Sequence, residues 1–266
     1  MELLTSQRKS LVVLSLALAA TLLLAASKTR THTLARPEFD ALPPIILWVW
    51  ERPENLEFID PKRFGVAFLA QTLVLLGDDV RLNPRHQPLI VSPETKLIAV
   101  TRIEAEKTSG ARPTLTEAQR DRVASFILKT LELGNVRAIQ IDFDPVMSER
   151  RFYRSLLEQV RKNLPQNVPL SMTALASFCV GDRWLDDLPV DEAIPMIFRM
   201  GPDNDKIRGF LAKGHDFREP LCRRSYGLAL DEPLQAPLEP SRRLYLFNAT
   251  GWKARDLIQF QQRTEQ

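Results

Sequence analysis

The sequence predicts an α/β barrel of the TIM type, complete or degenerate, that follows an N-terminal signal segment. Three observations favour this fold. Strand and helix patterns alternate along the chain, most strands are nearly continuous hydrophobic runs, and about seven or eight of them fit within about 220 residues. Strands buried on both faces are typical of a parallel sheet covered by helices. So many strands in one domain favour a closed barrel, with one hairpin in place of a βα unit.

The strands are predicted from short apolar runs bounded by turn residues. The first, residues 45–50 (IILWVW), is rich in β-branched and aromatic residues. Residues 66–76 (VAFLAQTLVLL) are ambiguous by periodicity, but the turn residues after them and a second β-like run at 88–91 favour strands with turns over one helix. The other predicted strands are residues 96–104, 137–144, 169–178, 192–200, 226–231 and 243–248.

Amphipathic periodicity predicts the helices between these strands. The clearest is 114–134, where Thr114 and Glu117 have capping-box spacing and Gly134 ends the apolar stripe. The other predicted helices are residues 149–164, residues 206–213 and the chain from residue 253. The domain organisation that follows is a signal peptide or anchor over 1–27, a linker over 28–43 and one barrel domain over 44–266.

The N-terminus has the proportions of a secretory signal. Arg8 and Lys9 precede the apolar run Leu11–Ala26, and small residues follow at its end. Sixteen residues are short for a membrane-spanning helix, which needs about 20. We therefore expect an exported protein, periplasmic or extracellular, with cleavage near Ser27, or an uncleaved anchor formed by residues 11–26 as the alternative.

Two cysteines, Cys179 and Cys222, are the only ones in the chain. In an exported protein an even count favours a disulfide, and two reduced, buried cysteines are the alternative.

Composition and motifs exclude several functions. There are 36 Lys and Arg residues against 33 Asp and Glu, a surplus too small to indicate a nucleic-acid partner. The sequence has no GxGxxG, GxxxxGK[ST] or GxSxG motif, and its three histidines are scattered, so neither a cofactor nor a metal site is predicted. A membrane partner is expected only through an uncleaved N-terminal segment, and the sequence does not define the oligomeric state.

Polar residues collect where the predicted strands end, which is where a parallel barrel carries its site. Asp142 and Asp144 share one strand face, and Glu104 shares a face with Arg102 on a neighbouring strand. Crowded carboxyl groups suit acid/base chemistry on a glycosidic bond, so Asp142, Asp144 and Glu104 are the catalytic candidates. The alternative is a structural ion-pair network of these acids with Arg102 and Arg199.

Other side chains at the same strand ends are candidates for binding substrate. Tryptophans next to charged residues can stack on sugar rings, although tryptophans in apolar strands are more often core residues. The substrate-binding candidates are Trp50, Glu51, Arg52, Arg102, Trp184, Arg199 and Asp231.

Six segments resemble an uncharacterised bacterial family, domain of unknown function 3142. They are LWVWERPENLEFIDP (47–61), GVAFLAQTL (65–73), IQIDFDPVMSERRFYRSLL (139–157), PLSMTALASFCVGDRWL (169–185), PMIFRMG (195–201) and PLCRRSYGLALDEP (220–233). The resemblance covers residues 45–252. It implies a glycosidase-like barrel without a settled substrate.

The strand with the two aspartates is also similar to the DxxDxDxE motif of chitinase-type glycosidases. Asp142 and Asp144 match its second and third aspartates, but the first aspartate falls at Ile139 and the acid glutamate at Val146. The substrate-assisted mechanism of that family is therefore not carried over. Either Asp144, Glu104 or Glu149 serves as the acid, or the barrel binds without cleaving.

Three functions follow as hypotheses. The first is an exported glycoside hydrolase-like barrel that acts on or binds an envelope or extracellular polysaccharide. The second is a catalytically silent barrel of the cell envelope that binds glycans or a partner. A phosphodiester-cleaving barrel is disfavoured because no histidine pair accompanies the acids.

Overall fold

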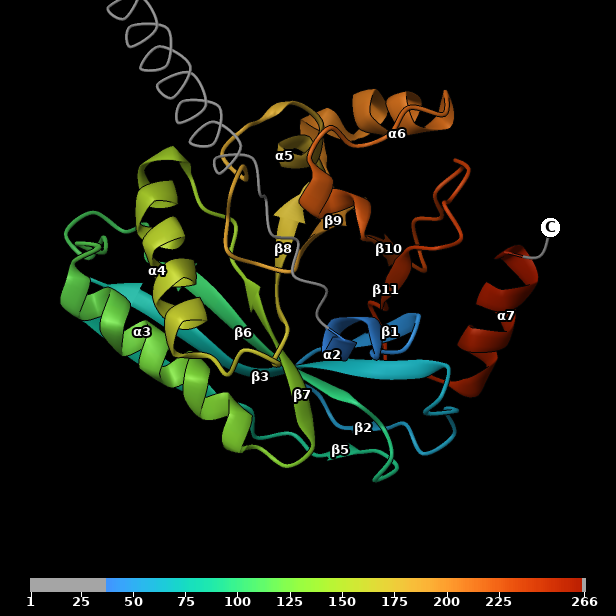
Figure 1. The fold of residues 1–266 in the computed structure, drawn as a ribbon, viewed down its shortest axis with the longest axis horizontal. Helices are drawn as coiled ribbons and strands as arrows, with labels where there is room; N and C mark the ends of the chain where they lie inside the picture. The colour runs from blue at the N-terminus through green and yellow to red at the C-terminus, as the bar shows by residue number, and fades with distance from the viewer. Residues whose placement is uncertain (1–36, 265–266) are drawn as a thin grey trace, which may run out of the picture. The chain divides into compact units, whose positions relative to one another are not determined.

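A closed barrel of eight parallel strands forms the centre of the computed structural model, which describes residues 37–264 (Figure 1). Strand β1 pairs in parallel with both β3 and β11, and this closes the ring. The predicted TIM-type fold is therefore confirmed. In order around the barrel the strands are β1 (Ile45–Val49), β3 (Phe64–Leu76), β6 (Leu97–Ala105), β7 (Val136–Asp142), β8 (Leu170–Leu175), β9 (Glu192–Met196), β10 (Ser225–Ala229) and β11 (Arg243–Phe247).

Helices cover the barrel from outside, and α3 packs beside α4 (Figure 1). Thr116 caps α3 by accepting a hydrogen bond from the backbone N–H of Gln119. The α-helices are α2 (Pro37–Asp40), α3 (Glu117–Lys129), α4 (Arg150–Asn163), α5 (Ala176–Gly181), α6 (Asn204–Ala212) and α7 (Ala254–Thr264). Short 3-10 turns are η1 (Thr130–Glu132), η2 (Met147–Glu149), η3 (Gly201–Asp203) and η4 (Pro220–Arg223). None of the helices within residues 37–264 has both the length and the apolar character needed to cross a bilayer.

The barrel is degenerate, as the sequence predicts. In the described chain no helix separates β1 from β3, β3 from β6, or β10 from β11. Strand β4 (Asp79–Pro84) instead turns back onto β3 as an antiparallel hairpin. A two-stranded parallel sheet of β2 (Glu54–Asn55) and β5 (Leu89–Ile90) accompanies it.

Six barrel strands end earlier than the sequence pattern predicts, and the differences are largest for β8 and β9. Strand β7 ends at Asp142, and β9 ends at Met196. The predicted strand 169–178 ends at Leu175, and residues 176–181 form α5 instead. The apolar side chains in this segment also fit the pattern of a strand. In the structure α5 buries them instead, including Phe178 and Cys179.

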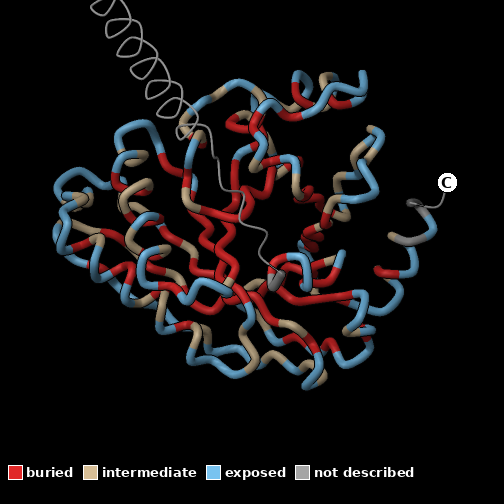
Figure 2. The backbone as a smooth tube through the Cα atoms, in the orientation of Figure 1, coloured by how far each residue is buried: buried red, intermediate tan, exposed pale blue. Residues whose placement is uncertain are grey.

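Alternating side chains build two apolar clusters. One lies inside the barrel and includes Ile46, Trp48, Val100 and Tyr245. The other lies between the barrel and its cover and includes residues from α3 and α4. Figure 2 shows the buried backbone concentrated in the strands and the exposed backbone on the outer helices and loops. The barrel is thus packed inside rather than an open pore.

The N-terminal ends of the strands, which we call the floor, are covered by α2. Phe39 and Leu42 are buried there. Arg243 donates hydrogen bonds to the carbonyls of Phe39 and Pro43, at 2.8 and 3.1 Å. Residues 37–43 therefore fold with the barrel, and the predicted linker over 28–43 extends too far. The predicted signal or anchor over 1–27 lies outside the described residues.

A disulfide joins Cys179 of α5 to Cys222 of η4, with 5.8 Å between the Cα atoms. This confirms the predicted pair. Cys179 follows the C-terminal end of β8, and Cys222 precedes β10. The crosslink therefore ties a segment that leaves the barrel's C-terminal end to one that enters the floor.

Candidate active site

A cleft of about 310 Å³ opens at the C-terminal ends of β6 and β7, the end that we call the mouth. Its lining includes all three predicted catalytic residues, Glu104, Asp142 and Asp144, together with Arg102. The strand register places Arg102 of β6 directly beside Asp142 of β7. Parallel strands that end at one level thus bring together residues that lie 40 positions apart in the sequence.

Asp142 is the buried acid of the cleft, with 8% of its surface exposed. Its carboxylate accepts a hydrogen bond from the Thr173 hydroxyl at 2.8 Å, and the guanidinium of Arg102 lies 3.5 Å away. Burial raises the pKa of Asp142 above its ordinary value, and the opposing effects of Arg102 and Thr173 are smaller. The charges of Asp144 and Glu104 raise the pKa further.

Asp144 lies two residues beyond Asp142 and is exposed to solvent in the cleft. Desolvation by the surrounding protein raises the pKa of its carboxyl as well, against the opposing charges of Arg102 and Lys107. Two neighbouring carboxyl groups with raised pKa values are an arrangement found more often at acid/base sites than at ordinary surfaces. The exposed one of the pair is the one that a substrate can reach.

Glu104 is the third acid, and its partner is also Arg102. Arg102 Nε lies 2.9 Å from Glu104 Oε1, so one guanidinium bridges Glu104 and Asp142. Glu149 also lines the cleft, but its carboxylate accepts a hydrogen bond from the backbone N–H of Val146 at 2.9 Å. Glu149 thereby stabilises the turn at η2, which makes it a weaker candidate acid than Asp144.

Two tryptophans pack near the cleft, and one of them contacts Arg102. The guanidinium carbon of Arg102 lies 5.9 Å from the ring centre of Trp50, which is only partly buried. Trp48, which is fully buried, packs under Trp50 with 4.3 Å between ring centres, and on its other side it stacks against Phe247. The predicted position of Trp50 at the site is thus supported by its contact with Arg102.

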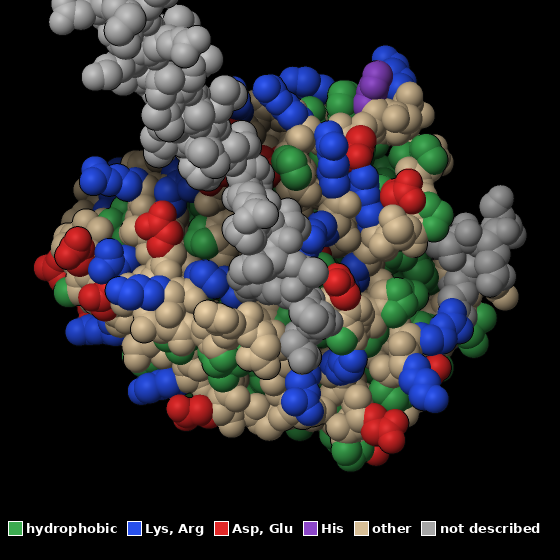
Figure 3. Space-filling view, viewed as in Figure 1, with side chains coloured by type: hydrophobic (Ala, Val, Ile, Leu, Met, Phe, Trp, Pro, Cys, Tyr) green, Lys and Arg blue, Asp and Glu red, His purple; other side chains and the backbone are tan. Residues whose placement is uncertain are grey.

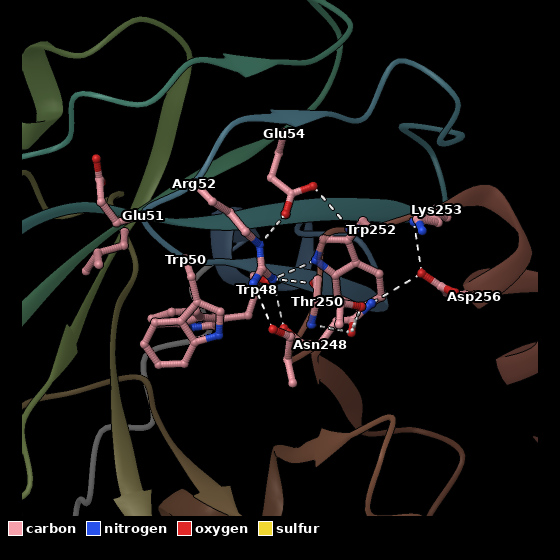
Figure 4. Close-up of polar contacts among 12 residues, drawn as sticks. Trp48, Trp50, Glu51, Arg52, Glu54, Asn248, Thr250, Trp252, Lys253 and Asp256 are labelled. Carbon is pink, nitrogen blue, oxygen red and sulfur yellow. Dashed lines mark hydrogen bonds and ion pairs between the residues drawn. The ribbon is translucent and has the colours of Figure 1, made fainter.

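Two predicted substrate-binding residues have structural contacts instead. Arg52 donates to the carbonyls of Asn248, Ala249 and Thr250 and pairs with Glu54 at 2.7 Å (Figure 4). It therefore clasps the loop after β11 rather than facing the cleft. Glu51 points away from this cluster in Figure 4 and accepts hydrogen bonds from two backbone N–H groups of the β4–β5 loop. The sequence placed both residues at a strand end but could not show that nearby backbone groups engage them.

The remaining predicted residues lie outside the cleft. Trp184 packs against Phe178 and Tyr153, with ring centres 5.5 and 6.0 Å apart. Arg199 pairs with Asp231 at 3.1 Å and also contacts Glu232. The ion-pair network expected as the alternative is therefore formed in part: Arg102 pairs with Glu104 and Asp142, whereas Arg199 has acidic partners of its own.

The structure adds two residues that the sequence analysis missed. Thr173, on the inward face of β8, holds Asp142, and the alternation of its strand could have placed it there. Lys107 lines the cleft from the chain that follows β6, where no periodicity signals its direction. Within residues 37–264, no group of three His, Cys, Asp or Glu side chains is placed to hold a metal ion.

Comparisons with known proteins yield fold similarity only. No protein-family model and no curated protein matches the chain. The spore cortex-lytic enzyme SleL of Bacillus cereus aligns over 69% of this chain and 50% of its own, with 15% identity and a TM-score of 0.44. The chitinase domain of the spore coat protein CotE of Clostridium difficile aligns over 82% and 67%, with 14% identity and a TM-score of 0.42. The chain thus spans half the length of the first structure. At such low identities and TM-scores, neither structure carries an inference about the function of this chain.

Proposed function

We propose that this chain is an exported glycoside hydrolase-like barrel that acts on an envelope or extracellular polysaccharide. The observation that carries the proposal is the pair Asp142 and Asp144, whose carboxyl groups both have a raised pKa in a cleft beside Trp50. Cleavage of a glycosidic bond needs one protonated and one ionised carboxyl group. A raised pKa increases the protonated fraction near neutral pH.

The contacts divide the acids into roles. Asp144 is exposed and has a raised pKa, so it is the proton donor to the leaving oxygen. Glu104 forms an ion pair with Arg102 and is the negatively charged partner. Asp142 is the buried member of the set, and its carboxylate accepts a hydrogen bond from the Thr173 hydroxyl. The exposed part of Trp50 offers a flat apolar surface for a sugar ring.

The disulfide supports the proposed export, because such bonds persist in oxidising compartments. Membership in domain of unknown function 3142 is part of the same proposal and rests on the six sequence segments.

A hydrolysis screen of the exported protein against envelope and extracellular polysaccharides tests this function. We expect wild-type cleavage of at least one glycan and a loss of about 100-fold or more in Asp144→Asn. Asp121→Asn, which removes an exposed carboxyl of α3 outside the cleft, is the matched control and keeps its activity. Cleavage by Asp144→Asn at the wild-type rate contradicts the assignment of the acid.

The second candidate is a silent glycan-binding barrel. It is favoured by one observation: Val146, 51% exposed, stands where the chitinase motif has its glutamic acid. Glycan binding that Trp50→Ala abolishes, with no hydrolysis of the bound glycan, selects this candidate over the enzyme.

A further inference from the structure

A second cavity, of about 450 Å³, lies at the floor of the barrel, at the opposite end from the cleft. It forms where α2 meets the chain that enters β10 and β11. Four arginines line it, Arg223, Arg224, Arg242 and Arg243, and Asp40 is its one acidic lining residue. Figure 3 shows Lys and Arg side chains spread over the face in view, with Asp and Glu side chains among them.

Two of the arginines share one carboxylate. Arg242 makes two hydrogen bonds to Asp216, at 2.8 and 2.6 Å. Arg223 lies 3.5 Å from the same Asp216 and donates its Nε–H to the Phe217 carbonyl. Both terminal nitrogens of Arg223 are left for another acceptor, and nearly half of this side chain is exposed. One carboxylate thus faces two guanidinium groups.

The other two arginines depend mainly on neutral acceptors. Arg224 donates to the Asp191 carbonyl at 3.1 Å and stacks over the Phe39 ring, with 5.0 Å to the ring centre. Arg243 donates to two backbone carbonyls and lies 3.6 Å from Glu192. Glu192 is the acidic group that faces both Arg243 and Arg224, and their charges oppose the effect of its burial on its pKa. Four guanidinium groups thus line a cavity whose lining has a single carboxylate, Asp40.

We propose that the floor cavity binds a multiply charged oxyanion of the phosphate class through Arg223 and Arg224. The guanidinium fork donates two parallel hydrogen bonds to phosphate oxygens, and the forks of Arg223 and Arg224, which line the same cavity, suit an anion with several acceptor oxygens. A monovalent carboxylate leaves more of this charge unmatched. The phosphate group can belong to a free anion or to a lipid headgroup, and both sources have the same chemistry at the cavity.

Titration of the full chain with inorganic phosphate, followed by calorimetry and by melting temperature, tests the site. Acetate at equal ionic strength is the monovalent control. We expect phosphate to bind and to raise the melting temperature more than acetate does. The double variant Arg223→Met/Arg224→Met weakens binding about tenfold or more, since two charge-assisted contacts are lost. Arg120→Met/Arg122→Met removes two arginines from α3, far along the chain from the cavity, and binds within twofold of wild type.

The result that overturns the proposal is phosphate binding that is no stronger than that of acetate, or binding that the double variant retains. If the double variant does not fold, as judged by circular dichroism, Arg223→Met alone replaces it, because nearly half of that side chain is exposed.

Sedimentation with vesicles identifies the source of the phosphate group. Phosphatidylcholine vesicles with and without phosphatidylglycerol are compared for wild type and the double variant. Binding to the anionic vesicles that depends on Arg223 and Arg224 supports a lipid headgroup as the ligand. Phosphate binding without such dependence supports a free anion. Vesicle binding through residues outside the cavity is the same in wild type and in the double variant. The difference between the two proteins therefore measures the binding that depends on Arg223 and Arg224.

Discussion

The mouth and the floor of this barrel both bring buried charges together, but they compensate those charges differently. At the floor, Arg243 and Glu192 lie 3.6 Å apart; Tyr245 donates a hydrogen bond to Glu192, and Arg243 donates to the carbonyls of Phe39 and Pro43. At the mouth, Asp142 has only the Thr173 hydroxyl and a guanidinium 3.5 Å away. The Arg243–Glu192 pair therefore contributes to stability, while the mouth keeps its acids in a state suited to chemistry.

The largest expected effect is the loss of the buried floor contact. Arg243→Met removes two hydrogen bonds and leaves Glu192 without its guanidinium, so we expect a loss of about 3–5 kcal/mol in the free energy of unfolding. For a domain of this size, that lowers the melting temperature by on the order of 10 °C. Arg102→Met at the mouth is the matched variant and costs about 1 kcal/mol or less, because Arg102 and its partner Glu104 are partly exposed. Equal losses of unfolding free energy in the two variants contradict the view that the charges at the floor stabilise the fold more than those at the mouth.

Removal of the disulfide comes next. Cys179→Ser/Cys222→Ser opens a crosslink between residues 43 positions apart, with an expected cost of about 2–4 kcal/mol in chemical denaturation. Thiol titration of the denatured, unreduced wild type detects no free thiol if the bond forms. Two titrating thiols disprove the crosslink between the two ends.

Arg52 gives a smaller effect at the mouth, where it is a structural clasp. Arg52→Met leaves the carbonyls of 248–250 without their donor, and we expect a loss of about 1–3 kcal/mol with faster amide hydrogen exchange in that loop. Arg199→Met, which removes an exposed ion pair, serves as the control. Unchanged stability in Arg52→Met, with loss of glycan binding, restores its predicted role in the substrate site.

Glu192 makes stability depend on pH. The native pKa is raised above the unfolded value of about 4.3, so the native state keeps a proton that the unfolded state releases. This contribution is complete below pH 4.3 and is lost as pH rises toward the native pKa, by at most about 1.4 kcal/mol per pH unit. Glu192→Gln abolishes that decline, which urea unfolding measured between pH 4 and 8 detects. The same pH dependence in both proteins shows that Glu192 is not the group responsible.

The sequence predicted those features that depend on local periodicity. Hydrophobic runs predicted the barrel strands, and the polar residues at their ends predicted that Asp142 and Asp144 meet at the mouth, although β7 ends at Asp142. Contacts between segments that are distant in the sequence leave no pattern in the neighbouring residues from which they could be predicted. The clasp of Arg52 joins positions nearly 200 residues apart, and α2 is held by Arg243 from the other end of the domain. Backbone carbonyls are the acceptors in both contacts, and no side-chain pattern identifies them.

The most direct test of the site is the titration of its two aspartates, followed by carbon-13 NMR of the side-chain carboxyl groups. Asp142→Asn and Asp144→Asn assign the two resonances. An unperturbed aspartate titrates near pH 3.9. Because burial outweighs the charge of Arg102 at both carboxyl groups, both are predicted to titrate above that value. Titration of both at or below pH 3.9 contradicts the proposal that the mouth of this barrel is an acid/base site.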